Sequence, residues 1–408
     1  MPTRILFLTP SWPLGQQYGG QIRALLIGRA LKEVGAVRVV VVDPGYQAER
    51  GRRATEEEFV VLPPARCSVA PNRTIWKRLR WALDQGYMNV HGEVVTMSDR
   101  RRIREYCVES DIVWVLNARL PNLLQQWEWS ASHLDLDNLA STYMRSVRRI
   151  KPRGTDALKA RFLEAVFRRR ERTFRQRFTT LSVCSEADRK DLGGGDAIHV
   201  IPNGFLAPTG EPARKPWREP RVGFIGLGSY EPNIDGVEWF LRECWPSVRR
   251  LVPGVRLRVA GRESDADRFN RPEGVDFLGE IADSAAEMAT WWAMVVPIRL
   301  GAGTRVKIAE AFSRKCPVIS TTLGAFGYDV QDWQHLRLAD TAPAFADACV
   351  DVLRDPASAE RLAERAFADY LQRWTWDAIA PKVWAAADAC LRASNSSVHS
   401  MRGTVEHR

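Results

Sequence analysis

The segment from Val295 to Gly327 constrains the fold more than any other part of the chain. It reads VVPIRLGAGTRVKIAEAFSRKCPVISTTLGAFG: an apolar run, a glycine-rich loop, an amphipathic helix and a second apolar run. Continuous apolar runs of this kind are typical of strands buried on both faces of a sheet. Two such strands joined through a helix form a parallel βαβ unit. The segment therefore predicts an α/β fold with a parallel sheet.

The loop of this segment carries groups suited to binding phosphate. The sequence GAGTR leads directly into the predicted helix, and the first turn of a helix presents free backbone N–H groups to an anion. Arg305 and Lys307 add positive charge that we expect to be mobile, and Glu310 can accept hydrogen bonds from two ribose hydroxyls. We therefore predict a nucleotide-diphosphate site made of Gly301, Gly303, Thr304, Arg305, Lys307 and Glu310.

The same strand-and-helix pattern recurs along most of the chain, in two blocks. The first contains the predicted strands RILFLT, VRVVVVDP, DIVWVLN, HLDLDN, TTLSVCS and HVIPNG, with a helix expected over 21–34 and a long basic helical region over 145–178. The second contains RVGFIG, VRLRVAG, VDFLG, MVVPI and PVIST, with a helix from Pro232 for which Asn233 or Asp235 is the candidate N-cap. Each block predicts a doubly wound parallel sheet.

A proline-rich and charged stretch separates the two blocks and sets the domain boundaries. We predict a Rossmann-like first domain over 1–206, a linker over 207–220 and a second Rossmann-like domain over 221–376. A C-terminal helix over 377–392 is expected to return to the first domain. The Ser/Asn-rich tail over 393–408 is expected to be disordered. Two such domains place a cleft between them, where ligands bind beyond the carboxyl ends of the strands.

Composition excludes several classes of protein. The chain has 408 residues and is 45% apolar, which allows two sizeable cores, and it contains no run of about 20 apolar residues that would span a membrane. The N-terminus lacks the pattern of a signal peptide. The seven cysteines have no close pair and the six histidines do not cluster, so neither a disulfide framework nor a metal site is expected. These features predict a cytoplasmic protein.

The net charge of +10 is concentrated in WKRLRWAL, in DRRRIRE and across residues 145–177. One interpretation is an ordinary solvated helix face. Another is attraction to an anionic membrane surface, where the Trp residues of WKRLRW would lie at the interface. A nucleic-acid partner is not expected, because no helix-turn-helix, zinc-finger or RNP-like motif accompanies the charge.

In the order and spacing of its motifs the chain resembles the retaining glycosyltransferases of family 4, which have the GT-B fold. The resemblance covers nearly all of residues 1–392 and is strongest in FIGLGSYEPNIDGVEWF, VAGRE, VDFLGEIAD and the segment from Val295, whose GAGTRxK form is a recurrent subgroup. It implies transfer of a sugar from a nucleotide-diphosphate donor, with retention and without an essential metal or other cofactor. The first domain would bind the acceptor and the second the donor.

The resemblance also implies roles for particular residues. Glu310 matches the second glutamate of the family's Glu-x7-Glu pair, which binds the donor ribose, whereas the first glutamate is replaced by Ala302. The glycines after the first strand of each domain approach the donor, and Arg262 lies where the family places residues near base and ribose. The residues assigned in this way are Gly19, Gly20, Gly226 and Arg262.

A second departure concerns the cations that hold the diphosphate. The family often has an Arg and a Lys in the loop after the first strand of the second domain, but here that loop, GLGSYEPNIDG, has neither. Arg305 and Lys307 would replace them, since a leaving diphosphate gains negative charge in the transition state. Surface roles for both are the alternative.

In the first domain, Asp135 and Asp137 alternate on one face of the predicted strand HLDLDN. We assign Asp137 to contact the sugar or the acceptor, with a turn-forming role as the alternative. Arg23 would meet phosphate or acceptor, or lie on the surface, and Trp12 would line the acceptor cleft or belong to the core.

These observations favour a retaining glycosyltransferase that uses a glycan, a lipid-linked or another hydroxyl acceptor, in the cytoplasm or at the inner face of the cell membrane. A nucleotide-sugar epimerase of the same fold remains an alternative. So does a non-catalytic nucleotide-sugar-binding subunit, because the first glutamate is missing.

Overall fold

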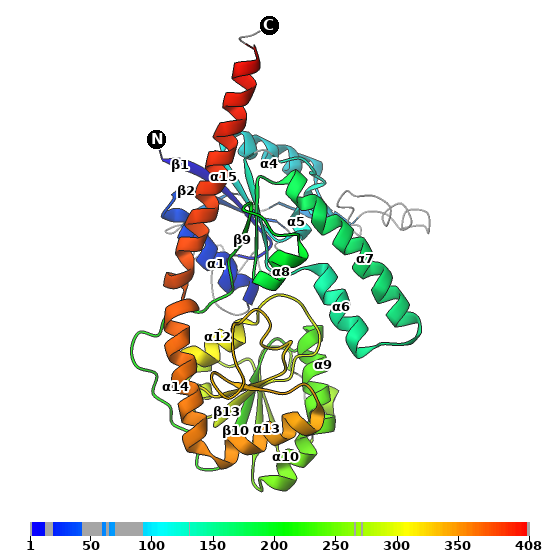
Figure 1. Ribbon diagram of the computed structural model, residues 1–408, viewed down its shortest axis with the longest axis vertical. Helices are drawn as coiled ribbons and strands as arrows, with labels where there is room; N and C mark the ends of the chain where they lie inside the picture. Colours follow the sequence, from blue (N-terminus) through cyan, green and yellow to red (C-terminus); the bar gives the residue numbers. More distant parts are fainter. Residues whose placement is uncertain are drawn as a thin grey trace. The chain divides into compact units, whose positions relative to one another are not determined.

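The computed structural model describes residues 2–12, 19–42, 59–62, 65–69, 93–129, 131–264, 267–270 and 272–405. The chain divides into two compact units. Unit 1 comprises Met1–Ser141, Arg161–Ile201 and Ala380–Arg408, and unit 2 comprises Thr142–Ala160 and Pro202–Ile379. Each unit is built around its own parallel sheet (Figure 1).

Within the described residues, the sheet of unit 1 has seven strands in the order β3-β2-β1-β6-β7-β8-β9, all parallel. The central strands are buried on both faces, as the apolar runs of β1 and β6 predict, and β7 also buries the polar residues Ser132, His133 and Asp135. The strands are β1 (Thr3–Thr9), β2 (Gly35–Val41), β3 (Val60–Val61), β6 (Ile112–Leu116), β7 (Ser132–Leu136), β8 (Thr180–Val183) and β9 (Ile198–Val200). A separate antiparallel pair is formed by β4 (Cys67–Val69) and β5 (Glu93–Val95).

Helices cover both faces of this sheet. They are α1 (Gly19–Lys32), α4 (Met97–Glu109), α5 (Arg119–Leu124), α8 (Glu186–Asp191), most of α7 (Gly154–Arg177) and most of α15 (Trp376–Val405). The indole of Trp384 on α15 donates to the carbonyl of Ala30 on α1 at 2.9 Å, so these helices lie together (Figure 1). The structure continues α15 to Val405, where the sequence led us to expect a disordered tail from Ala393.

The sheet of unit 2 has six parallel strands in the order β12-β11-β10-β13-β14-β15. The strands are β10 (Arg221–Ile225), β11 (Arg256–Ala260), β12 (Val275–Gly279), β13 (Ala293–Val296), β14 (Val318–Ser320) and β15 (Arg337–Leu338). In Figure 1, α12 (Val306–Ser313) and α14 (Pro356–Arg373) lie on one side of this sheet, and α9 (Glu231–Trp239) and α10 (Trp245–Leu251) on the other. The remaining helices are α11 (Ser284–Ala289), α13 (Ala342–Arg354) and the 3₁₀ turn η3 (Asp267–Phe269).

The helix expected from Pro232 is interrupted by a π turn, η2 (Phe240–Cys244), directly before α10. Pro246 follows this turn and has no N–H with which to continue an α-helical ladder, so the wider turn ends there. The N-cap of α9 is Tyr230 rather than Asn233 or Asp235. Asn233 is instead buried inside the first turns of the helix, where its amide serves tertiary contacts.

The predicted α/β class with two doubly wound parallel sheets is confirmed. One segment within the predicted first domain, 1–206, belongs to the other compact unit. Residues Thr142–Ala160, which contain most of α6 (Ala140–Ile150) and the start of α7, belong to unit 2. The predicted linker region is also bound to unit 2, because the amides of Lys215 and Trp217 donate to the carbonyls of Ala289 and Thr290, each at 2.9 Å.

Candidate functional site

The topological switch point of unit 2 lies between β10 and β13. From β10 the sheet continues to β11 and β12 on one side and to β13, β14 and β15 on the other. In open parallel sheets of this kind, ligands bind outside the carboxyl ends of the two strands that flank the switch point. Here those ends carry the loop that begins at Gly226 and the loop that runs from Pro297 to Arg305. The glycine-rich loop therefore lies where the topology places a ligand.

The glycine-rich loop has a backbone that only glycine adopts easily. Gly301 has a φ of 127° and Gly303 a φ of 71°, both in the positive region. A side chain at Gly301 would also collide with the guanidinium of Arg305. The loop is buried, and Thr304 is held through its hydroxyl oxygen, which accepts from the amide of Asn203 at 3.2 Å.

Arg305 is folded beneath this loop. It is the N-cap residue of α12 and is 8% exposed. Its guanidinium donates to the carbonyls of Ala302 at 2.6 Å and Gly303 at 2.7 Å, and its own carbonyl accepts from the Tyr328 hydroxyl at 3.0 Å. The sequence led us to expect a mobile cation here, whereas the structure shows a side chain that fixes the loop from inside.

Lys307 extends from α12 to the end of β10. Its Nζ donates to Oδ1 of Asn233 at 2.9 Å and lies 4.1 Å from the centre of the Phe224 ring. A Cβ at Gly226 would lie 2.9 Å from this Nζ. The ammonium group therefore stands beside the loop after β10, which contains no Arg or Lys of its own.

The surroundings of Lys307 disfavour its charged form. Burial among apolar groups is the largest effect and, with the nearby charge of Arg305, lowers the pKa of Lys307 to about 7, while Glu310 acts in the opposite direction. The side chain nevertheless keeps some exposure to solvent. An anion bound beside it would favour protonation.

Glu310 lies one turn further along α12. Ser284, the first residue of α11, donates through its hydroxyl to Oε1 of Glu310 at 2.7 Å. Within the described part of the chain, Oε2 has no hydrogen-bond partner. Burial raises the pKa of Glu310, and the Ser284 hydrogen bond opposes this rise. One carboxylate oxygen is thus fixed and the other can accept a ligand hydroxyl.

The other predicted donor residues lie on the same edge of unit 2. Arg262 follows β11, is partly exposed and pairs with Glu263 at 3.7 Å. Ala302, which stands where the first glutamate was expected, is buried in the glycine-rich loop and carries no polar group. The positions at the ends of β10, β11 and β13 are therefore brought together, as the parallel topology requires.

Helix α6 contributes two contacts to this edge that the sequence did not indicate. The amide of Gly301 donates to Oγ of Ser146 at 2.9 Å, and the hydroxyl of Tyr143 donates to Glu231, the first residue of α9, at 2.6 Å. One helix thus holds both the glycine-rich loop and the start of α9. Its sequence position, among the strands of the first block, gave no signal of this role.

Unit 1 has a second group of polar residues at the carboxyl edge of its sheet. Asp137 follows β7 and accepts from Nδ2 of Asn117, which follows β6, at 3.0 Å. Asn117 has a φ of 82°, and strained backbone of this kind concentrates at functional sites. Burial raises the pKa of Asp137 to about 6, opposed by Arg23 and supported by Asp135. The sequence did not single out Asn117, because its positive φ is seen only in the folded structure.

The remaining predicted residues of unit 1 serve the interior or the start of α1. Arg23 is 2% exposed, and its guanidinium donates to Asp135 and to the carbonyl of Ile201 at 3.1 Å. Trp12 is buried rather than exposed in a cleft. Gly19 and Gly20 open α1, and the preceding residues 13–18 lie outside the described part of the chain.

Three further features of the described residues concern metal-binding groups, membrane-spanning helices and disulfide bonds. None of their His, Cys, Asp and Glu side chains form a group of three or more that could hold a metal ion. No described helix is long and apolar enough to cross a lipid bilayer. None of the seven cysteines, all within the described ranges, forms a disulfide bond.

The segment of unit 2 that carries the switch-point loops matches a known protein family. Residues 219–355, which contain the switch-point loops, match the family Glycosyl transferases group 1. Over 156 residues the chain is 22% identical to an uncharacterized 44.6 kDa protein in the cps region of Klebsiella pneumoniae. That match covers 36% of this chain and 40% of the relative, so the chain spans about two fifths of the length of this curated protein.

Solved structures are similar over almost the whole chain. Sucrose-phosphate synthase from Thermosynechococcus elongatus has a TM-score of 0.62 at 17% identity, covering 93% of this chain and 97% of that one. HepE from Anabaena in complex with UDP-glucose has a TM-score of 0.61 at 15% identity, with 95% and 99% covered. A variant of S. aureus TarM, in complex with fondaparinux, α-GlcNAc-glycerol and UDP, has a TM-score of 0.63 at 10% identity, with 94% and 99% covered. The chain therefore has the GT-B fold, and residues 219–355 within it match the family Glycosyl transferases group 1.

Proposed function

We propose that this protein is a retaining glycosyltransferase that moves a sugar from a nucleotide-diphosphate donor to a hydroxyl acceptor. The observation that carries the proposal is the arrangement at the switch point of unit 2. A glycine-rich loop, the Lys307 ammonium group and the Glu310 carboxylate lie at one sheet edge within the matched domain. Loop amides and a cation suit a diphosphate, and a half-satisfied carboxylate suits ribose hydroxyls.

The reaction needs a developing negative charge to be stabilised as the nucleotide diphosphate leaves. We propose that Lys307 performs this task, and that Arg305 contributes by holding the loop amides in position, which its hydrogen bonds to the carbonyls of Ala302 and Gly303 support. Retention would follow if the acceptor attacks on the face from which the diphosphate leaves, with the diphosphate taking the acceptor proton. Asp137 of unit 1 is assigned to bind the acceptor hydroxyl. No metal and no other cofactor is required in this scheme.

The acceptor is proposed to be a glycan or a lipid-linked glycan. HepE and TarM were solved with UDP-glucose and with α-GlcNAc-glycerol, and the Klebsiella relative lies in a cps region. The glycan fondaparinux and the glycoside α-GlcNAc-glycerol in the TarM complex support a glycan acceptor, and UDP-glucose in the HepE complex supports a nucleotide-sugar donor.

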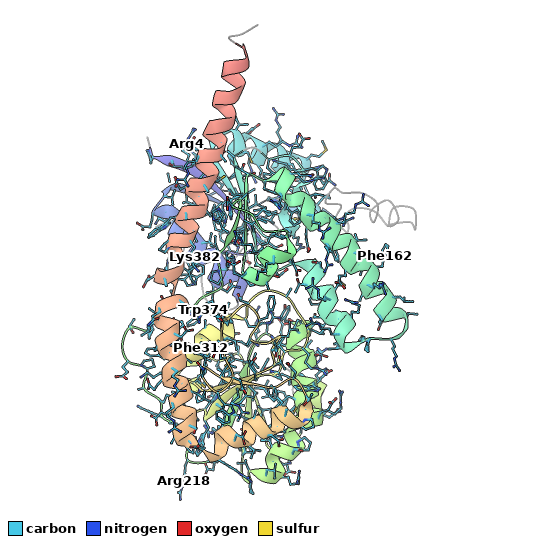
Figure 2. All side chains as sticks on the ribbon, viewed as in Figure 1. Arg4, Phe162, Arg218, Phe312, Trp374 and Lys382 are labelled. Carbon is cyan, nitrogen blue, oxygen red and sulfur yellow. The ribbon has the colours of Figure 1, made fainter. Side chains whose placement is uncertain are left out.

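Association with an anionic membrane surface is part of the proposal. On α7, Phe162 is 54% exposed and projects outward, with the exposed residues Arg161, Arg169 and Arg172 on the same helix (Figure 2). An exposed aromatic ring beside several cations suits the surface of an acidic bilayer. The basic segment WKRLRWAL, proposed for the same purpose, lies outside the described residues. Pelleting with anionic vesicles at low and high salt tests this part, and binding that does not depend on salt or on Phe162 would reject it.

The activity is tested with a panel of nucleotide sugars and the purified protein. Slow release of nucleoside diphosphate from one donor, accelerated by an acceptor extract, supports a transferase. Isomerisation of the donor sugar would instead support an epimerase. Nucleotide binding without turnover in any acceptor extract would support a non-catalytic binding subunit. Ala302 motivates this alternative, because it stands where a carboxylate was expected.

A further inference from the structure

Asn233 lies in the first turn of α9, directly after the loop that follows β10. It is 6% exposed and uses both ends of its amide group. Its Nδ2 donates to the carbonyl of Leu227 in the loop after β10 at 2.9 Å, and its Oδ1 accepts from Nζ of Lys307 at 2.9 Å. Asn233 therefore connects the β10 loop, its own helix α9 and the cation on α12.

The contact fixes where the Lys307 charge can point. An ammonium group has three N–H donors. One of them is directed at Asn233, and within the described residues Lys307 makes no other hydrogen bond. A Cβ at Gly226 would lie 2.6 Å from Asn233 Nδ2 and 2.9 Å from the Nζ, so the loop backbone limits the pair from the other side. The remaining N–H donors are left for an anion at the carboxyl end of β10.

We propose that Asn233 is the positioning residue of the donor site. It holds Lys307 against the β10 loop, so that a cation from α12 supplies the charge that this loop lacks in sequence. The inference rests on the proposed function, because it assumes that the anion is the diphosphate of a nucleotide. Asn233 acts through Lys307 rather than on the reacting atoms.

The contacts of Lys307 also predict that donor binding is coupled to protonation of its amino group. The charged groups that face Lys307 are Arg305 and Glu310, both on its own segment, while β10 and α9 contribute the uncharged Phe224, Gly226 and Asn233. Since the pKa of Lys307 is about 7 without ligand, a bound diphosphate raises it and takes up a proton near neutral pH. Nucleotide affinity should then fall as the pH rises through 7.

The test is a double-mutant cycle on nucleotide affinity. UDP, GDP, ADP and inorganic pyrophosphate are titrated into the full-length wild type, and the tightest binder is measured from pH 6 to 9 against Asn233→Ala, Lys307→Met and the double variant. Asn233→Ala should weaken binding about tenfold at pH 6.5, the scale of a lost charge-assisted hydrogen bond, and should alter the pH profile. In the Lys307→Met background the same change should have no further effect.

Two controls keep the outcome clear. Glu238→Gln, an exposed change on the same helix, should bind like the wild type. If Asn233→Ala does not fold, the isosteric Asn233→Asp replaces it, and its carboxylate should move the pH dependence upward. Equal losses from Asn233→Ala with and without Lys307 would overturn the positioning role alone. A folded wild type that binds none of the four probes would overturn the proposed donor site together with it.

Discussion

Ser146 Oγ accepts a hydrogen bond at 2.9 Å from the backbone amide of Gly301. The two residues are far apart in the sequence, yet both belong to unit 2. The contact places a side chain of α6 on the one loop whose amides are proposed to meet the donor. Ser146 is 3% exposed and also donates to the carbonyl of Tyr143 at 2.7 Å, so its hydroxyl is held in one orientation.

Replacing Ser146 with Ala should loosen the glycine-rich loop, because the buried Gly301 amide loses its acceptor. Leaving a buried donor unsatisfied costs about 1–3 kcal/mol, and we expect the free energy of unfolding to fall by that amount in urea titrations. Nucleotide affinity should fall as well, while Ser146→Thr, which keeps the hydroxyl, should retain most of both. Unchanged stability and affinity in Ser146→Ala would show that α6 has no part in shaping the loop.

Lys307 and Arg305 should separate in their effects on stability and turnover. Lys307→Met removes the cation proposed to face the diphosphate, and turnover should fall by about 10²–10³-fold, the scale of a lost oxyanion donor. The pKa of Lys307 is lowered to about 7 in the folded state, so the folded state holds the Lys307 proton less tightly than the unfolded chain does. Removing the ammonium group relieves this penalty at pH 7, which offsets the loss of the donor to Oδ1 of the buried Asn233, so we expect little change in stability.

Arg305→Ala should lower both turnover and stability. Its guanidinium donates to the carbonyls of Ala302 and Gly303, and these buried acceptors would lose their partner. We expect turnover to fall by about 10²-fold or more, together with a lower midpoint of thermal unfolding. Near-wild-type turnover in Arg305→Ala would contradict any role of this residue at the site.

Glu310→Gln should weaken donor binding without a comparable loss in kcat, because a ribose contact is made equally in the ground state and the transition state. Ser284→Ala should give the same type of effect at smaller size, since it frees the carboxylate oxygen that Ser284 now holds. Initial-rate kinetics at saturating acceptor measure both. A drop in kcat at unchanged KM for the donor would argue against ribose binding by Glu310.

The pH dependence of acceptor use should report Asp137. Its pKa is raised to about 6 by burial, so the carboxylate form gains population as the pH rises through 6. If the ionised form accepts the acceptor hydroxyl, kcat/KM for the acceptor should rise over the same range at saturating donor. Asp137→Asn should be less active and lack this rise, and a retained rise would assign the titration to another group.

Much of this fold was predictable because parallel strands buried on both faces leave continuous apolar runs, as in RILFLT and MVVPI. The edge that carries Gly301, Lys307 and Glu310 followed from the same logic, since a loop and the next helical turns share one end of a sheet. The predictions that were wrong concerned residues whose roles depend on tertiary contacts. From the sequence, Asn233 was a candidate helix N-cap. Only the structure shows that it instead accepts a hydrogen bond from Lys307, 74 positions away.

Arg305 illustrates a further limit. A sequence shows that a cation follows a glycine-rich loop, but it does not show whether the side chain points at a ligand or back at its own loop. The conformation of Gly301 decides this, because its positive φ and missing Cβ open the space that the Arg305 guanidinium fills. The segment Thr142–Ala160 posed a similar problem, since its membership of unit 2 rests on contacts with residues more than 80 positions away.

The most direct test of the central claim is proton NMR of the sugar released or transferred from a nucleotide-sugar panel by the wild-type protein, with Lys307→Met run in parallel. If the protein is a retaining transferase, one donor should lose its sugar with the anomeric configuration of the donor retained in the first-formed product, and Lys307→Met should abolish most of this signal. Release of the opposite anomer, or equal turnover by Lys307→Met, would contradict this proposal.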